Sequence, residues 1–294
     1  MALNFSLGLK VLGKGCIIIE LRKHMTNPVE TDISLDEAKS AEPEVVLTPA
    51  EEAMLKTMIE HNVFYGHSKS RTNPKMRPFV LSAKSGVQIV DLMKTMSQLD
   101  KAVAMVKDKV RLGGSVLFVG TTPATKFIVK ETAQRLQMPY VTTRWLGGTL
   151  TNFKTILTRI NHFKKLEEDK VAGRLQKYTK KERVMIDVEL SKLDRFFRGI
   201  VGLDKLPSAV VITELGDGEI AAREAKLTKI PAVAFVNTNR DPDLVKYPIA
   251  SNDRNSKSVA FLLSHIEKAV VEGRVAKEAD AAKLAEKAKA PAVK

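Results

Sequence analysis

Short runs of mostly apolar residues alternate with amphipathic segments through most of this chain, and this alternation restricts its fold more than any other feature. Residues 115–119, 209–212 and 232–236 each have the composition and length of a buried strand. Strands buried on both faces are typical of a parallel sheet covered by helices on both sides. We expect further strands at 87–90, 140–142 and 247–249, and helices at 91–109, 125–136, 219–227 and 256–272. The sequence therefore predicts a doubly wound, flavodoxin-like α/β sandwich of three layers with a parallel sheet.

One segment, residues 151–198, departs from this alternation. It has no strand signal and carries thirteen Lys and Arg against seven Asp and Glu. Apolar residues recur at steps of three and four, at Phe153, Ile156, Ile160 and Phe163 and again at Ile186, Leu190, Leu193 and Phe197. Two helices with one narrow apolar stripe each can bury it against each other. We expect an antiparallel helical coiled-coil hairpin inserted at residues 152–199, either a solvated link between strands or, given its excess of cations, a polyanion-binding arm.

The rest of the chain divides by composition. Residues 1–47 hold a basic start and then an acidic, proline-containing stretch, which we expect to form a poorly ordered extension and linker without a targeting peptide. Thr48, Pro49 and Glu51 have the pattern of a capping box, which predicts that a helix begins there. The sandwich is then expected to span residues 48–272, followed by a Lys- and Ala-rich tail at residues 273–294.

The charge of the chain favours an anionic partner. It has 294 residues, a formal net charge of +14 and a pI of about 9.7. Nucleic acid is the first candidate partner and an anionic membrane surface the second. The single cysteine, Cys16, cannot form an internal disulfide, which fits a reducing compartment. No apolar run approaches the ~20 residues needed to span a bilayer.

Two segments concentrate the features that suit an anionic polymer. Residues 66–79 carry four cations, two prolines and no carboxylate to neutralise the charge. Residues 144–153 place an arginine and the single tryptophan beside two adjacent glycines, directly before the charged segment. Neither segment has the acid–base pair, metal ligands or nucleophile that catalysis needs. We therefore expect both to hold a polyanion, with Trp145 as a core anchor rather than a base-stacking platform.

Other candidate chemistry has a simpler structural explanation. Residues 120–126 follow a buried strand and open a helix, which is where a phosphate-binding P-loop would lie. However, Thr125 stands in place of the second glycine of a P-loop, and Phe127 stands in place of the Ser or Thr that binds magnesium. We expect an ordinary βα turn there. Asp241, Asp243 and Asp253 are expected to form turns and caps rather than a cation site. We predict no catalytic residue, no metal site and no cofactor.

Several short motifs follow one another in a specific order. They are Gly-His at 66–67, Asn-Pro-Lys-Met at 73–76, Gly-Val-Gln-Ile-Val-Asp-Leu at 86–92, Leu-Phe-Val-Gly-Thr at 117–121, Arg-Trp-Leu-Gly-Gly-Thr-Leu-Thr-Asn-Phe at 144–153, Asn-Thr-Asn at 237–239 and Asp-Pro-Asp at 241–243. Their joint order and spacing resemble the small-subunit ribosomal protein S2 family in its bacterial or organellar form, from residue 55 to residue 270.

This resemblance implies a fold, a role and a set of partners. It implies an α/β sandwich with a protruding helical hairpin that binds small-subunit rRNA near the junction of the head and the body. Neighbouring small-subunit proteins, including ribosomal protein S1 in organisms that have it, are the implied protein partners. The chain departs from the family pattern at Asn237, where aspartate is more usual, and this loss of a charge argues further against a cation site.

Taken together, the residues and the resemblance predict a structural, non-enzymatic constituent of the small ribosomal subunit that supports assembly and translation. We expect it in cytoplasmic rather than organellar ribosomes, with no membrane contact and no small-molecule substrate. The predicted RNA contacts are Lys69, Arg71, Lys75, Arg77, Arg144, Lys154, Arg159, Lys164, Lys165, Lys177, Lys180, Lys181, Arg183, Arg195 and Arg198. The predicted structural hinge comprises Trp145, Gly147, Gly148 and Asn152. The alternative is an α/β enzyme that binds a nucleotide or sugar phosphate, which would need an acid–base pair at the carboxyl ends of the strands.

Overall fold

The computed structural model describes residues 8–12, 16–20 and 48–289, and the side chains of residues 48–281. The chain forms two compact units, residues 1–56 and residues 57–294. In the first unit, β1 (Gly8–Leu12) and β2 (Cys16–Glu20) pair as an antiparallel hairpin in which Leu12 lies opposite Cys16. The remainder of the predicted extension at 1–47 lies outside the described residues.

Helix α1 (Pro49–Glu60) begins at the predicted capping box. The backbone N and the Oγ1 of Thr48 each donate to Glu51 Oε2 at 2.8 Å, and Glu51 N donates back to Thr48 Oγ1 at 3.4 Å. The hydrogen bonds from Thr48 hold the pKa of the Glu51 carboxyl below its usual range. Because these reciprocal bonds satisfy donors that have no partner within the helix, the first turn is stable where the sequence predicted it.

Five parallel strands form the centre of the second unit. They are β6 (Val116–Val119), β7 (Tyr140–Val141), β8 (Ala209–Ile212), β9 (Ala232–Val236) and β10 (Tyr247–Ala250). Their order across the sheet is β10-β9-β8-β6-β7, and every neighbouring pair is parallel. Numbered along the chain, this order reads 2-1-3-4-5 from the β7 edge, which is the flavodoxin-like arrangement. The predicted doubly wound sandwich is therefore confirmed.

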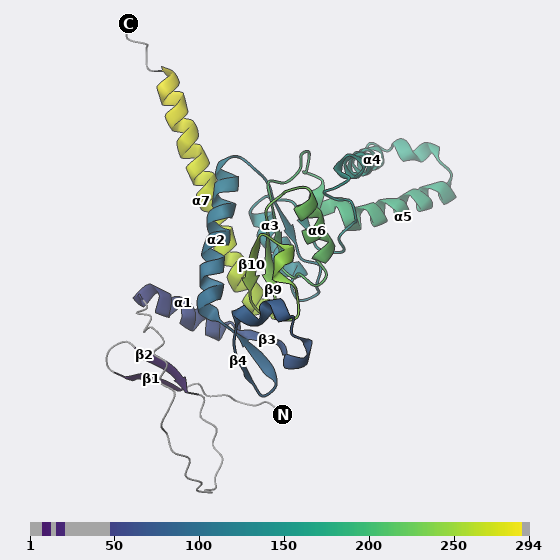
Figure 1. The fold of residues 1–294 in the computed structure, drawn as a ribbon. Coiled ribbons are helices and arrows are strands. Elements are labelled where there is room, and N and C mark those ends of the chain that lie inside the picture. The colour runs from purple at the N-terminus through teal and green to yellow at the C-terminus, as the bar shows by residue number, and fades with distance from the viewer. Residues whose placement is uncertain (1–7, 13–15, 21–47, 290–294) are drawn as a thin grey trace. The chain divides into compact units, whose positions relative to one another are not determined.

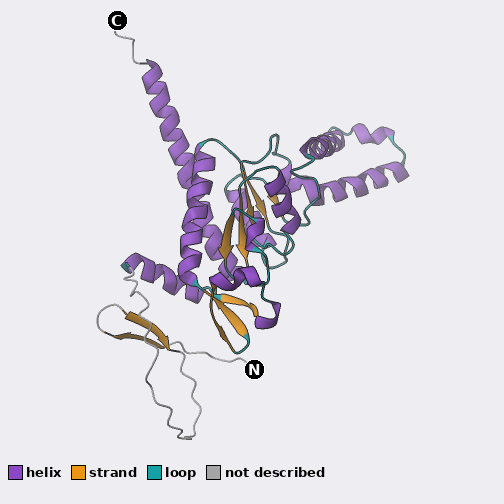
Figure 2. Ribbon diagram, viewed as in Figure 1, coloured by secondary structure: helices purple, strands orange, loops and turns teal. Residues whose placement is uncertain are grey.

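Helices cover both faces of this sheet, as Figures 1 and 2 show. Helices α2 (Leu92–Arg111), α3 (Lys126–Arg135) and α7 (Ser256–Lys289) pack together as one layer, and α6 (Glu219–Leu227) packs against β8 and β9. Leu117 and Val119 of β6 share a buried core cluster with Ala221 and Ala225 of α6. Because successive strand residues point to opposite faces, Phe118 faces the other helical layer and is also fully buried.

A second, antiparallel sheet precedes α2. It consists of β3 (Tyr65–Ser68), β4 (Val80–Lys84) and β5 (Val87–Val90) in the order β3-β5-β4. The prediction that residues 87–90 belong to the parallel sheet was therefore wrong. Burial alternates along β5, as expected for a strand with one solvated face. The sequence of only four residues is too short to distinguish such a strand from one that is buried on both faces. Ser85 and Gly86 both have positive φ, 51° and 78°, which suits the tight turn between β4 and β5.

The charged segment between β7 and β8 is helical. It contains α4 (Phe153–Val171), the 3-10 helix η3 (Arg174–Lys177), α5 (Lys180–Phe197) and the 3-10 helix η4 (Arg198–Ile200). Ile156, Ile160 and Phe163 of α4 and Phe197 of α5 belong to the same core cluster as the sheet residues. These four stripe residues are therefore buried, in part against the sandwich itself, whereas Phe153, Ile186, Leu190 and Leu193 are half-buried. The arrangement of the two helices as a protruding coiled-coil hairpin stays a prediction.

Helix α7 does not end at residue 272 as expected, but continues into the predicted tail as far as Lys289. A Cβ on Gly273 would lie 2.8 Å from Lys107 O and 2.9 Å from Val110 Cβ of α2. The glycine therefore allows two helices to approach closely and does not end a helix. Arg111 Nε and Asp280 Oδ2 form an ion pair at 2.6 Å across the same contact, where α2 and α7 run side by side (Figure 1).

Candidate nucleic-acid interface

The basic segment 66–79 is fixed in place rather than an open loop. It forms β3 and two 3-10 helices, η1 (Lys69–Arg71) and η2 (Pro74–Phe79). His67 N donates to Thr238 Oγ1 at 2.8 Å, and Asn73 N donates to Thr238 O at 2.9 Å. A Cβ on Gly66 would lie 2.6 Å from Thr238 Cγ2, so only glycine permits this approach to the residues after β9. The cations of this segment therefore have a fixed backbone.

The four predicted cations of this segment have different surroundings. Lys75 Nζ lies 2.8 Å from both Asp241 Oδ2 and Asp243 Oδ2, and hydrogen bonds to these two carboxylates raise the pKa of Lys75 to about 12. The expectation that no carboxylate neutralises these cations was therefore wrong for Lys75. The other three are exposed and form no ion pair with any described residue; they are Lys69, Arg71 and Arg77.

Two further arginines, which the sequence analysis missed, lie beside this segment. Burial and then the positive charges of Arg254, Arg71 and Arg240 lower the pKa of His67, so these three guanidinium groups lie near enough to act on the charge of one imidazole. Arg254 is exposed, and Arg240 lies 3.9 Å from Glu219. Both follow predicted parallel strands by a few residues, and the carboxyl ends of such strands meet at one edge of the sheet. We call Lys69, Arg71, Arg77, Arg240 and Arg254 the carboxyl-edge basic surface.

A single carboxylate holds the residues that join β7 to α4. Glu224 Oε1, on α6, accepts from Trp145 Nε1 at 3.0 Å and from Gly148 N at 2.8 Å. Glu224 Oε2 accepts from Leu150 N at 2.9 Å and from Thr151 N at 3.3 Å. Burial alone would raise the pKa of Glu224, but these hydrogen bonds, first that of Trp145, hold it below the ordinary value of 4.5. The ionised carboxylate therefore fixes the turn, and the sequence analysis missed it.

The four residues of the predicted hinge have different roles in this turn. Trp145 is only 4% exposed, so it anchors the core as expected. Gly148 has φ +88°, a conformation that favours glycine, whereas a Cβ on Gly147 would meet nothing within 4 Å. Asn152 Oδ1 accepts from Thr155 Oγ1 at 2.8 Å and does not cap α4. That these residues act together as a hinge stays a prediction.

The predicted cations of α4 and α5 fall into two groups. Lys164 pairs with Asp204 at 3.7 Å, and Arg198 pairs with Glu167 at 3.0 Å and also with Asp194. The others are exposed and form no ion pair with a described residue: Lys154, Arg159, Lys165, Lys177, Lys180, Lys181, Arg183 and Arg195. We call these eight residues the α4–α5 basic surface. Arg144 is also exposed and unpaired within the described part of the chain, next to the hydrogen bond of 3.1 Å from Thr143 Oγ1 to Arg195 O.

The turn after β6 is a packing feature. A Cβ on Gly120 would lie 2.5 Å from Val129 Cγ2 of α3 and 2.8 Å from Thr213 Oγ1. The glycine is therefore required for close contact between α3 and the sheet, as expected for an ordinary βα turn. Lys126 Nζ lies 5.1 Å from the centroid of the Phe127 ring beside it.

The carboxyl edge of the sheet also holds buried acidic groups. Asn237 Nδ2 donates to Asp253 Oδ1 at 2.8 Å. Burial raises the pKa of Asp253, and burial together with the charges of Asp253 and Asp217 raises the pKa of Glu214 to about 7. Within residues 48–281, no group of three or more His, Cys, Asp or Glu side chains is arranged to hold a metal ion. Across the described ranges, no helix has the length and apolar character to cross a membrane.

The fold and these surfaces define a class: a doubly wound α/β protein that displays exposed cations at the carboxyl edge of its sheet and on two charged helices. The family model for ribosomal protein S2 matches residues 58–273. The chain is also similar to the small ribosomal subunit proteins uS2 of Coprothermobacter proteolyticus, Rhodococcus erythropolis and Roseiflexus castenholzii. Their identities are 42%, 43% and 40%, over 75%, 74% and 76% of this chain and 82%, 77% and 85% of their own lengths. This chain therefore belongs to the ribosomal protein S2 family.

Family membership decides between the two functional alternatives. Ribosomal protein S2 is a family of structural ribosomal proteins, so the chain is not an enzyme, and the nucleotide- or sugar-phosphate-binding enzyme is set aside.

Proposed function

We propose that this protein is a structural constituent of the small ribosomal subunit and binds the rRNA of that subunit through its carboxyl-edge and α4–α5 basic surfaces. In this role it supports subunit assembly and translation. Its partners are small-subunit rRNA and neighbouring small-subunit proteins, with ribosomal protein S1 among them in organisms that have it. Its location is the ribosome, in the cytoplasm.

The observation that carries this proposal is the set of exposed cations left without a described carboxylate partner. Thirty-four Asp and Glu accompany forty-eight Lys and Arg in the chain, so most cations could in principle be neutralised. The structure instead pairs Lys75, Lys164 and Arg198 with carboxylates, and half-buried Arg240 with Glu219 at 3.9 Å. It leaves the other cations of the two basic surfaces exposed and without an ion pair to a described residue. Folded RNA presents phosphates at its surface and is recognised mainly by shape and backbone contact, which suits such groups.

The chemistry of the carboxyl-edge basic surface fits phosphate in particular. Four of its five members are arginines, whose planar guanidinium can bind two phosphate oxygens at once. Arg71, Arg240 and Arg254 come from three separate segments, and the charge of each acts on His67. The contacts to Thr238 fix the backbone of the segment that carries Arg71.

Binding to purified small-subunit rRNA across a range of salt concentrations tests this proposal. The variant Arg71→Glu with Arg77→Glu should lose at least tenfold in affinity, and the slope of log K against log salt should fall by about 2, because two phosphate contacts are lost. Lys130→Glu with Lys268→Glu changes the net charge equally at exposed positions outside both surfaces and serves as the control. Circular dichroism confirms that both variants fold. Equal losses in the two variants would show that net charge alone, and not this surface, binds the RNA.

A further inference from the structure

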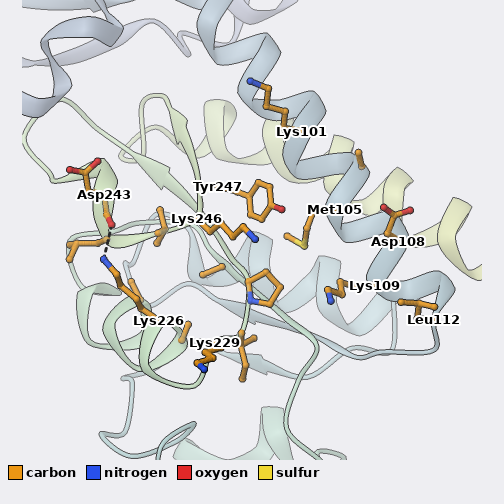
Figure 3. Close-up of a pocket in the computed structure, with 18 residues that line it drawn as sticks. Lys101, Met105, Asp108, Lys109, Leu112, Lys226, Lys229, Asp243, Lys246 and Tyr247 are labelled. Carbon is orange, nitrogen blue, oxygen red and sulfur yellow. Dashed lines mark hydrogen bonds between the residues drawn. The ribbon is translucent and has the colours of Figure 1, made fainter.

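A groove lies at the amino ends of the parallel strands. Helices α2 and α6 and the starts of β9 and β10 border an open pocket of about 860 Å3 (Figure 3). Pro231 and Ala232 line it at the start of β9, and Lys246 and Tyr247 at the start of β10. Because β9 and β10 are parallel, their amino ends lie at the edge opposite their carboxyl ends. The groove is therefore distinct from the carboxyl-edge basic surface.

The floor of this groove is aliphatic. Met105 of α2, Ala225 of α6 and Val245 are buried beneath it, and Ile230 is half-buried beside them. Leu112, at the end of α2, lines the groove and is 82% exposed. Exposed apolar surface such as that of Leu112, in a groove bordered by polar side chains, is typical of a site that receives an apolar group from a partner.

Five lysines surround this floor: Lys101, Lys109, Lys226, Lys229 and Lys246. Two carboxylates, Asp108 and Asp243, also line the groove. Asp243 already pairs with Lys75 at 2.8 Å, and Lys226 Nζ donates to the backbone O of Asp243 at 3.2 Å. None of the five lysines forms an ion pair with a described residue. The rim of the groove is therefore positively charged.

The positions of these lysines are not explained by the helices alone. Lys109 and Lys226 lie in the last turns of α2 and α6, where a cation offsets the negative end of the helix dipole. Lys101 lies in the middle of α2, and Lys246 lies directly before β10, so neither has such a role. Charge from separate elements thus converges on one aliphatic floor.

We propose that this groove docks an acidic polypeptide segment of another protein. A large apolar side chain of that segment packs on the aliphatic floor beside Leu112, and Asp or Glu residues on either side of it pair with the lysines. This is the arrangement of an apolar interface core with a charged rim. The lysines supply the charge complementarity that selects an acidic partner.

The lining favours a polypeptide over single-stranded RNA. Proteins hold single strands by stacking bases on aromatic rings as well as by binding phosphates. Tyr247 is the one aromatic residue among the described residues that line the groove, and Lys246 Nζ already lies 5.7 Å from the centroid of its ring. An RNA strand would use the lysines and leave the aliphatic floor uncovered.

Fluorescence anisotropy with the purified full chain tests the proposal. The probe is a short labelled peptide in which leucines alternate with pairs of glutamates. Companion peptides replace every glutamate with glutamine, or every leucine with serine, and oligouridylate serves as the nucleic-acid competitor. The variants are Lys109→Glu with Lys229→Glu, and Leu112→Ser, each at partly or fully exposed side chains that leave the core intact. The control is again Lys130→Glu with Lys268→Glu.

The acidic, leucine-containing peptide should bind, and both companion peptides should bind more weakly. The lysine reversals should weaken binding by roughly tenfold and Leu112→Ser by roughly threefold, while the control should change it by less than about twofold. Absence of peptide binding, or an equal loss in the control, would overturn the proposal. Displacement of the peptide by oligouridylate that depends on Lys109 and Lys229 would also overturn it, and would identify the groove as a nucleic-acid site.

Discussion

The carboxylate of Glu224 is expected to determine the stability of the turn between β7 and α4. It accepts five hydrogen bonds, from the indole of Trp145, from the backbone N of Gly148, Leu150 and Thr151, and from Thr151 Oγ1. The substitution Glu224→Gln keeps the size of the side chain but replaces one accepting oxygen with an NH2 group. Whichever way the amide turns, at least two of the four N–H donors lose their acceptor and face another donor.

The expected cost follows from these contacts. A hydrogen bond to a charged group contributes ~1.5–3 kcal/mol, and an unsatisfied buried donor costs ~1–3 kcal/mol. Removing the charge relieves part of its burial penalty, so we expect Glu224→Gln to lower the free energy of unfolding by about 3 kcal/mol. This is a large fraction of the ~5–15 kcal/mol that stabilises a typical protein. The folded pKa of Glu224 lies below its ordinary value of 4.5, so the stabilisation is present above that pH and is lost as the pH falls through the folded pKa.

Urea unfolding followed by tryptophan fluorescence measures this directly, because Trp145 is the single tryptophan of the chain. Its emission reports on the turn itself, and the loss of its hydrogen bond to Glu224 should shift the emission of the folded state. Glu219→Gln is the matched control on the same helix. Glu219 pairs with Arg223 at the surface at 2.5 Å, so its substitution should cost less than about 1 kcal/mol.

A loss of less than about 0.5 kcal/mol in Glu224→Gln, together with unchanged emission of Trp145, would show that the carboxylate does not stabilise the turn. A loss that persists undiminished in acid, below the titration of the wild-type carboxylate, would also contradict this role of the carboxylate. In that case the cost would come from packing rather than from the charge.

Three further predictions concern Glu214, Gly66 and Lys75. The pKa of Glu214 is raised to about 7, so the folded state keeps a proton that the unfolded state has lost, and the free energy of unfolding should fall as the pH rises from 4.5 through about 7. In urea unfolding, the wild-type chain should lose about 1 kcal/mol over this pH range relative to Glu214→Gln, a magnitude that allows for the partial exposure of Glu214. Gly66→Ala should lower the free energy of unfolding by about 2 kcal/mol because its Cβ would clash with Thr238, whereas Gly202→Ala, with nothing within 4 Å, should change it by less than about 0.5 kcal/mol. Lys75→Gln should lower the affinity for rRNA less than Arg71→Gln does, because two carboxylates already neutralise Lys75; a larger loss for Lys75→Gln in filter binding would contradict the assignment.

The parallel sheet was predictable because its strands carry a strong local signal. The residues of β8 and β9 are all buried, and a run of four or five apolar residues between helical patterns is typical of a strand covered on both faces. The three-stranded sheet was not predictable in the same way. Most of β4 is exposed, so its sequence has no apolar alternation to mark it, and β5 alone does not specify its neighbours.

The sequence around Glu224 contains a signal of its buried position. In α6 the buried residues Ala221, Ala222 and Ala225 define the inner face, and Glu224 falls on that face. A carboxylate at a core position needs partners, so its position alone indicates a buried polar network. The identity of those partners could not be derived, because the turn that donates to it lies about seventy residues earlier in the chain.

The candidate site was predictable as a set of charges but not as a surface. Composition identified the cations of residues 66–79, but the pairing of Lys75 with Asp241 joins residues 166 positions apart and depends on the completed fold. The same holds for Arg240 and Arg254, whose charges reach His67 because the carboxyl ends of parallel strands meet at one edge. The role of Gly273 in the close approach of α7 to α2 could not be predicted for the same reason, because α2 is distant from it in the sequence.

The exposed cations of the two basic surfaces are expected to attach this protein to the small ribosomal subunit. Sucrose-gradient sedimentation of cell lysate at physiological salt tests it most directly. The wild-type chain and the variant Lys130→Glu with Lys268→Glu should sediment with the small subunit, whereas Arg71→Glu with Arg77→Glu should move largely to the free fraction. Sedimentation of that last variant with the subunit at wild-type levels, or a wild-type chain that remains free of ribosomal particles, would contradict the account.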